Sequence, residues 1–209
     1  ITDSKLKEFN KIKKIVKNKN TILDINQKKI RKLGFKDKFK LPGEFQFKNF
    51  LMAALASKLC GGKISSISEH LKKIKPVNGR LELIRTLPNE AKIFIDYAHT
   101  PDALENVMTA LVKQFNKKIT LVFGCGGERD KSKRKLMARV ANNFCDKIIV
   151  TDDNPRNEIP SKIRNEIFKY ISSKNKFNIG RRNKAIEYSL VHSSYEEIIL
   201  IAGKGHESI

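Results

Sequence analysis

Four short polar segments hold the side chains most able to do chemistry, and each directly follows an apolar run. They are residues 96–100 (DYAHT), 124–129 (GCGGER), 152–156 (DDNPR) and 203–207 (GKGHE). Arg129 and Arg156 can each grip a carboxylate with two parallel hydrogen bonds, and Glu207 can bind an ammonium group. Brought together, these groups would fit a zwitterionic amino acid. Simpler alternatives are a solvated basic turn, helix capping by the acids and a flexible glycine turn.

A cluster of cations follows the glycines of the second segment. Arg129, Lys131, Lys133 and Arg134 crowd the start of a predicted helix, where positive charge is unfavourable because the helix dipole is already positive there. An anion bound near this turn would offset that cost, so we expect one. Glycines at 124–127 allow a sharp turn or a close approach of backbone to a ligand.

Standard phosphate and metal sites are not recognisable in the sequence. The chain has no Walker A pattern, and the segment 124–129 misses the last glycine of GxGxxG. His99 and His206 are too isolated to suggest a metal site, and we expect none in this chain. The three cysteines are widely spaced, which suits a reducing compartment and a cytoplasmic protein.

The elements that must position these segments alternate between strand-like and helical patterns. Apolar runs predict strands at 81–85, 92–96, 119–123, 147–151 and 197–202, and helices are predicted at 101–115, 132–144, 161–170 and 183–191. This alternation is typical of an α/β fold with a Rossmann-like, doubly wound and mainly parallel sheet. In such sheets functional residues gather beyond the carboxyl ends of the strands, where the four polar segments fall.

The first third of the chain differs in character from the rest. Residues 1–42 are polar and basic, residues 49–59 predict a buried helix, and residues 75–79 (KPVNG) read as a linker. We therefore expect two domains, 1–75 and 76–209.

The net charge of +21 raises the question of nucleic-acid binding. Lysine supplies 33 of the 43 basic residues, whereas direct base readout relies on arginine, and aromatic residues make up only 8% of the chain. The simpler interpretation is a solvated lysine-rich surface. A basic nucleic-acid-binding module in residues 1–40 remains the alternative from another class of protein. No apolar run is long enough for a membrane span, so we expect none.

The four segments together resemble the C-terminal domain of the Mur ligase family. DYAHTPDAL at 96–104, GCGGERDKSKR at 124–134, TDDNPR at 151–156 and AGKGHE at 202–207 follow the family's order. Residues 43–56 are similar to the end of the family's central ATP-binding domain. The resemblance implies that 1–75 is the C-terminal part of that α/β domain and that 76–209 is a C-terminal domain truncated at its end.

The resemblance also implies roles for individual residues. DNPR is typical of the family members that accept meso-diaminopimelate instead of lysine, and it stands intact here. The implied meso-diaminopimelate contacts are Arg129, Asp153, Asn154, Pro155, Arg156, Gly203 and Glu207. The implied ATP contacts are Asn49, Arg80, Asp96, His99 and Thr100.

The reaction implied is ATP-dependent amide formation in peptidoglycan synthesis. ATP would phosphorylate the D-glutamate carboxylate of UDP-MurNAc-L-Ala-D-Glu, and the amine of meso-diaminopimelate would displace the phosphate. The phosphate loop, the Mg²⁺ ligands and the catalytic residues are expected upstream of residue 1, so the fragment alone should be inactive. Lysine-adding and folylpolyglutamate-type ligases of the same superfamily are the alternatives.

Overall fold

The computed structural model divides the chain into two compact units, Ile1–Lys75 and Pro76–Ile209. It describes residues 1–5, 8–16, 24–26 and 34–205. Each unit is described by itself below.

A six-stranded sheet forms the centre of the second unit. The strands lie in the order β1-β2-β6-β3-β4-β5, and their bounds are β1 Glu82–Thr86, β2 Lys92–Asp96, β3 Ile119–Phe123, β4 Cys145–Val150, β5 Lys176–Asn178 and β6 Ile198–Ala202. Strand β1 pairs with β2 in the antiparallel direction, and every other pairing is parallel. The prediction of a mainly parallel α/β sheet is therefore confirmed.

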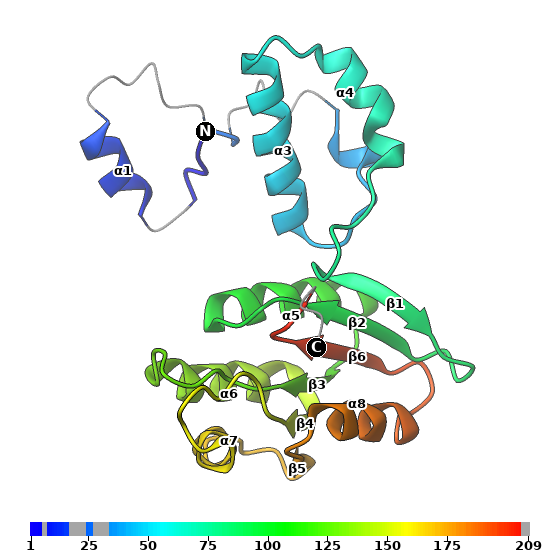
Figure 1. Cartoon of the computed structure of the whole chain (residues 1–209). Coiled ribbons are helices and arrows are strands. Elements are labelled where there is room, and N and C mark those ends of the chain that lie inside the picture. The colour runs from blue at the N-terminus through cyan, green and yellow to red at the C-terminus, as the bar shows by residue number, and fades with distance from the viewer. Residues whose placement is uncertain (6–7, 17–23, 27–33, 206–209) are drawn as a thin grey trace. The chain divides into compact units, whose positions relative to one another are not determined.

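Helices cover both faces of this sheet (Figure 1). They are α5 Pro101–Phe115, α6 Ser132–Phe144, α7 Pro160–Phe168 and α8 Arg182–Val191. The connections through α5, α6 and α7 step along the sheet in one direction, whereas the connection through α8 steps back from β5 to β6. Because crossovers between parallel strands are right-handed, this reversal puts α8 on the opposite face. Ala185 of α8 accordingly packs on Val122 and Ile149.

The sequence explains why these elements form. All five residues of β3 are buried, as expected for a strand that is covered on both faces. Thr100 caps the start of helix α5, because its hydroxyl accepts from the Ala103 N–H, and Asn116, with a φ of 51°, caps its end. Its buried residues recur at helical spacing, so one apolar stripe faces the sheet; they are Leu104, Val107, Met108 and Leu111.

Two features of the sheet differ from the sequence-based expectation. Strand β5 was not predicted, because it has only three residues and no apolar run. Strand β1 is an antiparallel edge, and Leu83 and Ile84 on it are about half exposed. Its pairing follows from the short turn that joins it to β2, since a parallel pairing needs a crossover connection.

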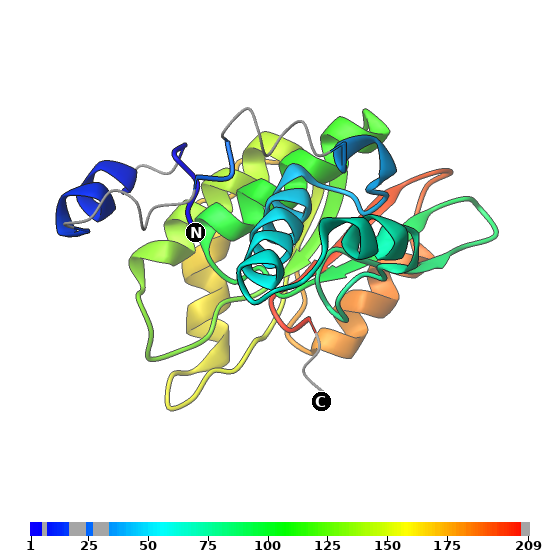
Figure 2. The same cartoon turned by 90° about the horizontal axis from the view of Figure 1, so that it is seen from above.

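Helices dominate the described part of the first unit. They are α1 Phe9–Ile15, the 3₁₀ turns η2 Lys36–Lys38 and η3 Leu71–Lys73, α3 Glu44–Leu59 and α4 Ile64–His70. Helices α3 and α4 pack side by side (Figures 1 and 2). Their core contains Phe35, Leu51, Leu55 and Leu71. The predicted helix at 49–59 is confirmed and begins five residues earlier, at Glu44. Thr2 and Asp24 form an isolated parallel bridge, and the described residues of this unit show no strand.

The central strands should dominate the stability of the second unit. Leu121→Ala removes a fully buried side chain from β3, so we expect the free energy of unfolding to fall by about 2–5 kcal/mol. Leu83→Ala is the matched control, because Leu83 is 47% exposed and should change that free energy by less than about 0.5 kcal/mol. Urea unfolding followed by circular dichroism measures both, and equal effects would contradict this account of the core.

Candidate functional site

The parallel pairing brings four polar segments to one edge of the sheet. Residues 96–100, 124–129, 152–156 and 203–205 follow the carboxyl ends of β2, β3, β4 and β6. These four strands are neighbours in the order β2-β6-β3-β4. Residues 96–100 and 203–205, far apart in the sequence, therefore lie at the same edge of the sheet, as the pattern of strands predicted.

The glycine loop after β3 packs directly on the loop after β4. The Gly127 N–H donates to the Asn154 carbonyl at 2.9 Å. A Cβ on Gly127 would stand 2.0 Å from the Pro155 carbonyl oxygen, and one on Gly124 would stand 2.4 Å from that of Thr151. Both positions require glycine because backbone meets backbone there. The glycines thus serve the packing of one loop on another, a use that the sequence analysis did not name.

Arg156 lies in the loop after β4, and one nitrogen of its guanidinium is held by a hydrogen bond to the loop after β3. Its backbone has a φ of 51°, and its N–H donates to Asn154 Oδ1 at 3.3 Å. Arg156 Nη1 donates to the Gly127 carbonyl at 2.7 Å. A guanidinium has five N–H donors, and the residue is exposed, so donors remain to bind a carboxylate. The anchor reduces the conformational entropy that binding would cost.

Arg129 is exposed and its side chain makes no hydrogen bond or ion pair with the residues that the structure describes. Its neighbour Glu128 has a φ of 50° and accepts from Asn157 Nδ2 at 2.7 Å. Arg129 therefore projects from a constrained turn with its guanidinium free of these partners.

The other cations at this helix start have partners within the protein. Arg134 is 2% exposed and forms ion pairs with Glu158 at 2.8 Å and Glu166 at 2.6 Å. These two carboxylates raise the pKa of Arg134 against the effect of its burial. Hydrogen bonding to Arg134 lowers the pKa of Glu158 to about 2. The anion expected near Arg134 is thus supplied by the chain itself, and the expectation of a bound anion rests on Arg129 and Arg156.

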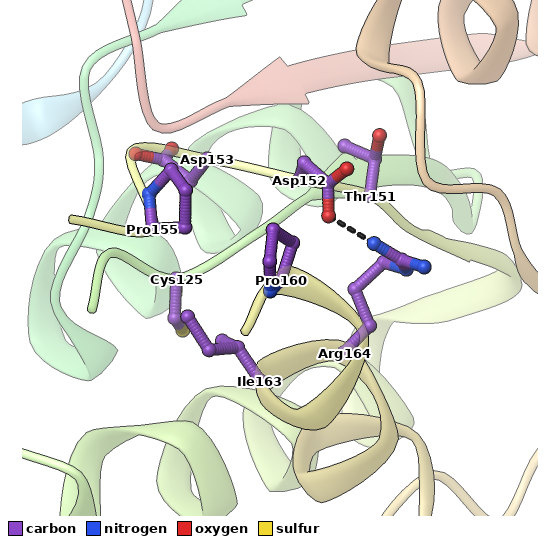
Figure 3. Close-up of a pocket in the computed structure, with 8 residues that line it drawn as sticks. All are labelled: Cys125, Thr151, Asp152, Asp153, Pro155, Pro160, Ile163 and Arg164. Atoms are coloured by element: carbon purple, nitrogen blue, oxygen red, sulfur yellow. Dashed lines mark hydrogen bonds and ion pairs between the residues drawn. The ribbon is translucent and has the colours of Figure 1, made fainter. Parts of the chain in front are cut away.

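The adjacent carboxylates of Asp152 and Asp153 diverge (Figure 3). Asp152 forms an ion pair with Arg164, so it belongs to the support of the loop. Asp153 turns toward the side of Pro155, and its Oδ2 lies 3.0 Å from the place that a Cβ on Gly203 would occupy. Asp153 is thus the acidic side chain of this loop that lies next to Gly203.

The crevice between these residues in Figure 3 is not a ligand pocket. It lies between the loop after β4 and α7, and it is too narrow to admit a water molecule. Cys125 lines it, and burial raises the pKa of this thiol to about 12. The thiol therefore stays protonated at neutral pH and cannot act as a nucleophile.

Gly203 connects the loop after β4 with the loop after β2. Its N–H donates to the Asp96 carbonyl at 3.0 Å, and its φ of 113° is one that side chains rarely adopt. The glycine lets β6 end between Asp96 on one side and Asp153 on the other. Glu207, predicted to bind the same ligand, lies outside the described residues.

Asp96 is buried at the end of β2 and binds two backbone N–H groups. Its Oδ2 accepts from Leu81 and its Oδ1 from Ala98, both at 2.7 Å. Burial raises the pKa of the carboxyl, and these hydrogen bonds with the charge of Arg80 offset only part of the effect. In this structure Asp96 holds the turn before β1 against the loop after β2, and the ribose contact implied for it stays a prediction.

Arg80 lies in that turn and stacks on an aromatic ring. Its guanidinium carbon is 4.4 Å from the centre of the Tyr97 ring, and the ring of His99 meets Tyr97 edge-on at 4.8 Å. The Thr100 hydroxyl caps the N-terminus of α5. Asn49 is exposed on α3, in the first unit. The nucleotide roles of these residues also stay predictions.

The sequence analysis missed Glu158, Glu166 and Tyr97. One signal for the two acids was available, because Arg134 occupies the buried stripe of α6 together with Met137, Ala138 and Ala141. A cation at a stripe position must meet internal carboxylates, since an unpaired buried charge is costly. Which carboxylates they are depends on tertiary packing.

The described residues contain no group of three or more His, Cys, Asp or Glu side chains that could hold a metal ion. No helix within the described ranges is both long and apolar enough to cross a membrane.

Comparison with known proteins places this architecture in a family. The model of the Mur ligase, glutamate ligase domain, matches residues 79–205. A curated relative from Rickettsia typhi, named UDP-N-acetylmuramoyl-L-alanyl-D-glutamate--2,6-diaminopimelate ligase, is 46% identical over 168 residues, which cover 79% of this chain and 33% of the relative. The relative of that name from Wigglesworthia glossinidia brevipalpis is 40% identical and is covered to 34%.

Solved structures give the same result. A structure of a ligase with that name is 36% identical, has a TM-score of 0.60 and covers 80% of this chain and 34% of its own. UDP-N-acetylmuramate-alanine ligase from Thermotoga maritima shares the fold, with a TM-score of 0.63 at 21% identity and coverage of 80% and 36%. The chain spans about a third of the length of the curated relatives it matches. Because the family model matches more than half of its residues, this chain belongs to the Mur ligase family.

Proposed function

We propose that this chain is part of an ATP-dependent ligase that adds meso-diaminopimelate to UDP-MurNAc-L-Ala-D-Glu in peptidoglycan synthesis. The observation that carries the proposal is the intact Asp153-Asn154-Pro155-Arg156 turn, with its anchored guanidinium at the carboxyl edge of the sheet. The names of the similar ligases contain UDP-N-acetylmuramoyl-L-alanyl-D-glutamate and 2,6-diaminopimelate, which supports this pair of substrates. Three free cysteines support a cytoplasmic location.

The charges at this edge of the sheet support a pocket for an amino acid, with cations for its carboxylates and acids for its ammonium groups. Meso-diaminopimelate differs from lysine by a carboxylate at its far end. Arg156, and Arg129 on the facing loop, would bind carboxylate. Glu207 keeps the ammonium group that the sequence analysis assigned to it, and Asp153 beside Gly203 would take the second ammonium group of the ligand. A guanidinium left without its carboxylate would disfavour lysine, because a site built for a charged group rejects the analogue that lacks it.

The nucleotide side of the site is proposed from the other two loops. Arg80 would meet phosphate, Asp96 would meet the ribose, and His99 and Thr100 lie on the same loop. Asn49 of the first unit would contact the adenine. ATP supplies the phosphoryl group that activates the glutamate carboxylate, and the role proposed for these residues is to bind and orient it.

We assign residues 1–75 to the C-terminal part of the central ATP-binding domain and residues 76–209 to the C-terminal domain. The chain has no Walker A pattern. We therefore place phosphoryl transfer, and the Mg²⁺ ligands that accompany the phosphates in it, on a part of the enzyme outside these 209 residues. Here the chain's work is to hold the incoming amino acid in position for attack.

Lysine-adding and folylpolyglutamate-type ligases are the competing assignments. The folylpolyglutamate synthase of Mycobacterium tuberculosis shares the fold at 21% identity, which does not decide the substrate. The DNPR turn favours meso-diaminopimelate over both.

Calorimetric titration of the 209-residue chain tests the pocket. Meso-diaminopimelate should bind and lysine should not. Arg156→Ala should weaken binding by about 10–100-fold, because it removes charge-assisted hydrogen bonds worth about 1.5–3 kcal/mol. Arg156→Lys should not restore it, since lysine lacks the planar fork.

Arg139→Ala is the matched control for that titration. Arg139 is an exposed arginine on α6, so its removal should leave the affinity unchanged. Equal binding of lysine and meso-diaminopimelate, or no loss with Arg156→Ala, would refute the proposed role of Arg156.

The 209-residue chain by itself should show no ligase activity. With ATP, Mg²⁺, UDP-MurNAc-L-Ala-D-Glu and meso-diaminopimelate present, an ADP-release assay should stay at background. The full-length ligase from Rickettsia typhi serves as the positive control. ADP release that depends on both acceptor and amino acid would show that the catalytic centre lies within these residues.

A further inference from the structure

One carboxylate outside the DNPR turn holds the two arginine-bearing loops together. Glu158 Oε1 accepts from the Glu128 N–H at 2.7 Å and from Arg134 Nη2 at 2.8 Å. Glu128 belongs to the loop after β3, and Glu158 lies at the end of the loop after β4. A single oxygen atom therefore ties the backbone of the first loop to the second and ties both to α6.

The position of Glu158 is itself fixed from inside the protein. Arg134 is buried, and its second carboxylate partner is Glu166 of α7. Its guanidinium is therefore held at both ends, which orients the donor that Glu158 meets. Because the pKa of Glu158 is lowered to about 2, the carboxylate stays charged throughout the neutral range.

The tie falls between the two arginines that the proposed function uses. Arg129 directly follows Glu128, and Arg156 lies two residues before Glu158. Glu128 has a φ of 50°, a conformation that is unfavourable for a side chain with a Cβ. The bond to Glu158 helps to keep the backbone in this turn and so sets the direction in which Arg129 leaves it.

We propose that Glu158, oriented by Arg134, is a positioning residue that fixes Arg129 relative to Arg156 and so adjusts the site to a dicarboxylic amino acid. The proposal rests on the proposed function. Glu158 would touch no substrate, and its effect would pass through the two guanidinium groups.

The chain offers a matched control for this role. Glu166 shares Arg134 with Glu158, but it makes no bond to the loop after β3 among the described contacts. Glu158→Gln and Glu166→Gln each remove one charge from the same buried arginine. Only the first weakens the link to the Glu128 N–H. Glu158 also pairs with Lys131 at 3.6 Å, so stability is measured for both variants. A purely structural role would make the loss of affinity in each variant follow its loss of stability.

The experiment measures meso-diaminopimelate affinity by calorimetry, melting temperature, and hydrogen exchange at the Glu128 amide in the ligand-free chain. Glu158→Gln should weaken binding by about tenfold and speed exchange at Glu128. Glu166→Gln should lower the melting temperature with affinity within about twofold of the original. In an Arg156→Ala background the effect of Glu158→Gln on binding should shrink, because residues that act through one another are not additive.

Different results overturn different claims. Unchanged affinity in Glu158→Gln, or equal losses in both glutamate variants that follow the melting temperature, would overturn the positioning role alone. If the unmodified chain does not bind meso-diaminopimelate although exchange at Glu128 still depends on Glu158, the proposed function fails, and the role for that ligand fails with it.

Discussion

The close packing of two loops is the constraint on which the rest of this site depends. With a Cβ at Gly127 the Pro155 carbonyl would be 2.0 Å away, so the loops after β3 and β4 can meet only if that position carries no side chain. Once they meet, the Gly127 carbonyl becomes the acceptor for Arg156 and its N–H the donor to Asn154. The glycine thus sets where the guanidinium stands. The parallel register of β3 and β4 brings these loops to the same edge.

Much of the second unit could be predicted because its elements are long and regularly patterned. The helices Pro101–Phe115 and Ser132–Phe144 and the strands Lys92–Asp96 and Ile119–Phe123 have the predicted bounds. Their apolar stripes and runs are strong local signals, and α5 carries its own start and stop residues. Strand β5 has no such signal. Its three residues form a strand because α7, which precedes them, brings them beside β4. This strand therefore depends on tertiary packing and not on a local sequence signal.

For the site too, some features could be predicted from local sequence patterns and others depend on tertiary packing. That Asp96, Arg129, Arg156 and Gly203 lie at one edge follows from the parallel direction of the strands, which the alternating pattern indicates. The strand order that makes these strands neighbours comes from the structure. What each side chain touches does not follow. Both carboxylate oxygens of Asp96 accept hydrogen bonds from backbone N–H groups, and Arg134 points inward and donates to Glu158 and Glu166. The bond from Ala98 to Asp96 is a local one, two positions along the chain, but Leu81, Glu158 and Glu166 lie 15 or more positions from the residues they contact, and no spacing rule predicts those contacts.

The two guanidinium groups proposed for one ligand are held differently, and under the proposed function this difference would affect selectivity. Arg156 is anchored to a carbonyl, whereas Arg129 makes no side-chain bond with the described residues. An anchored donor loses little entropy on binding but tolerates little change in ligand length, and an unanchored donor does the reverse. Relatives at 21% identity keep this sheet, so the scaffold alone does not choose a substrate. Under the proposed function, the choice would rest on how rigidly the loops hold their charges, and supporting residues such as Glu158 would take part in specificity.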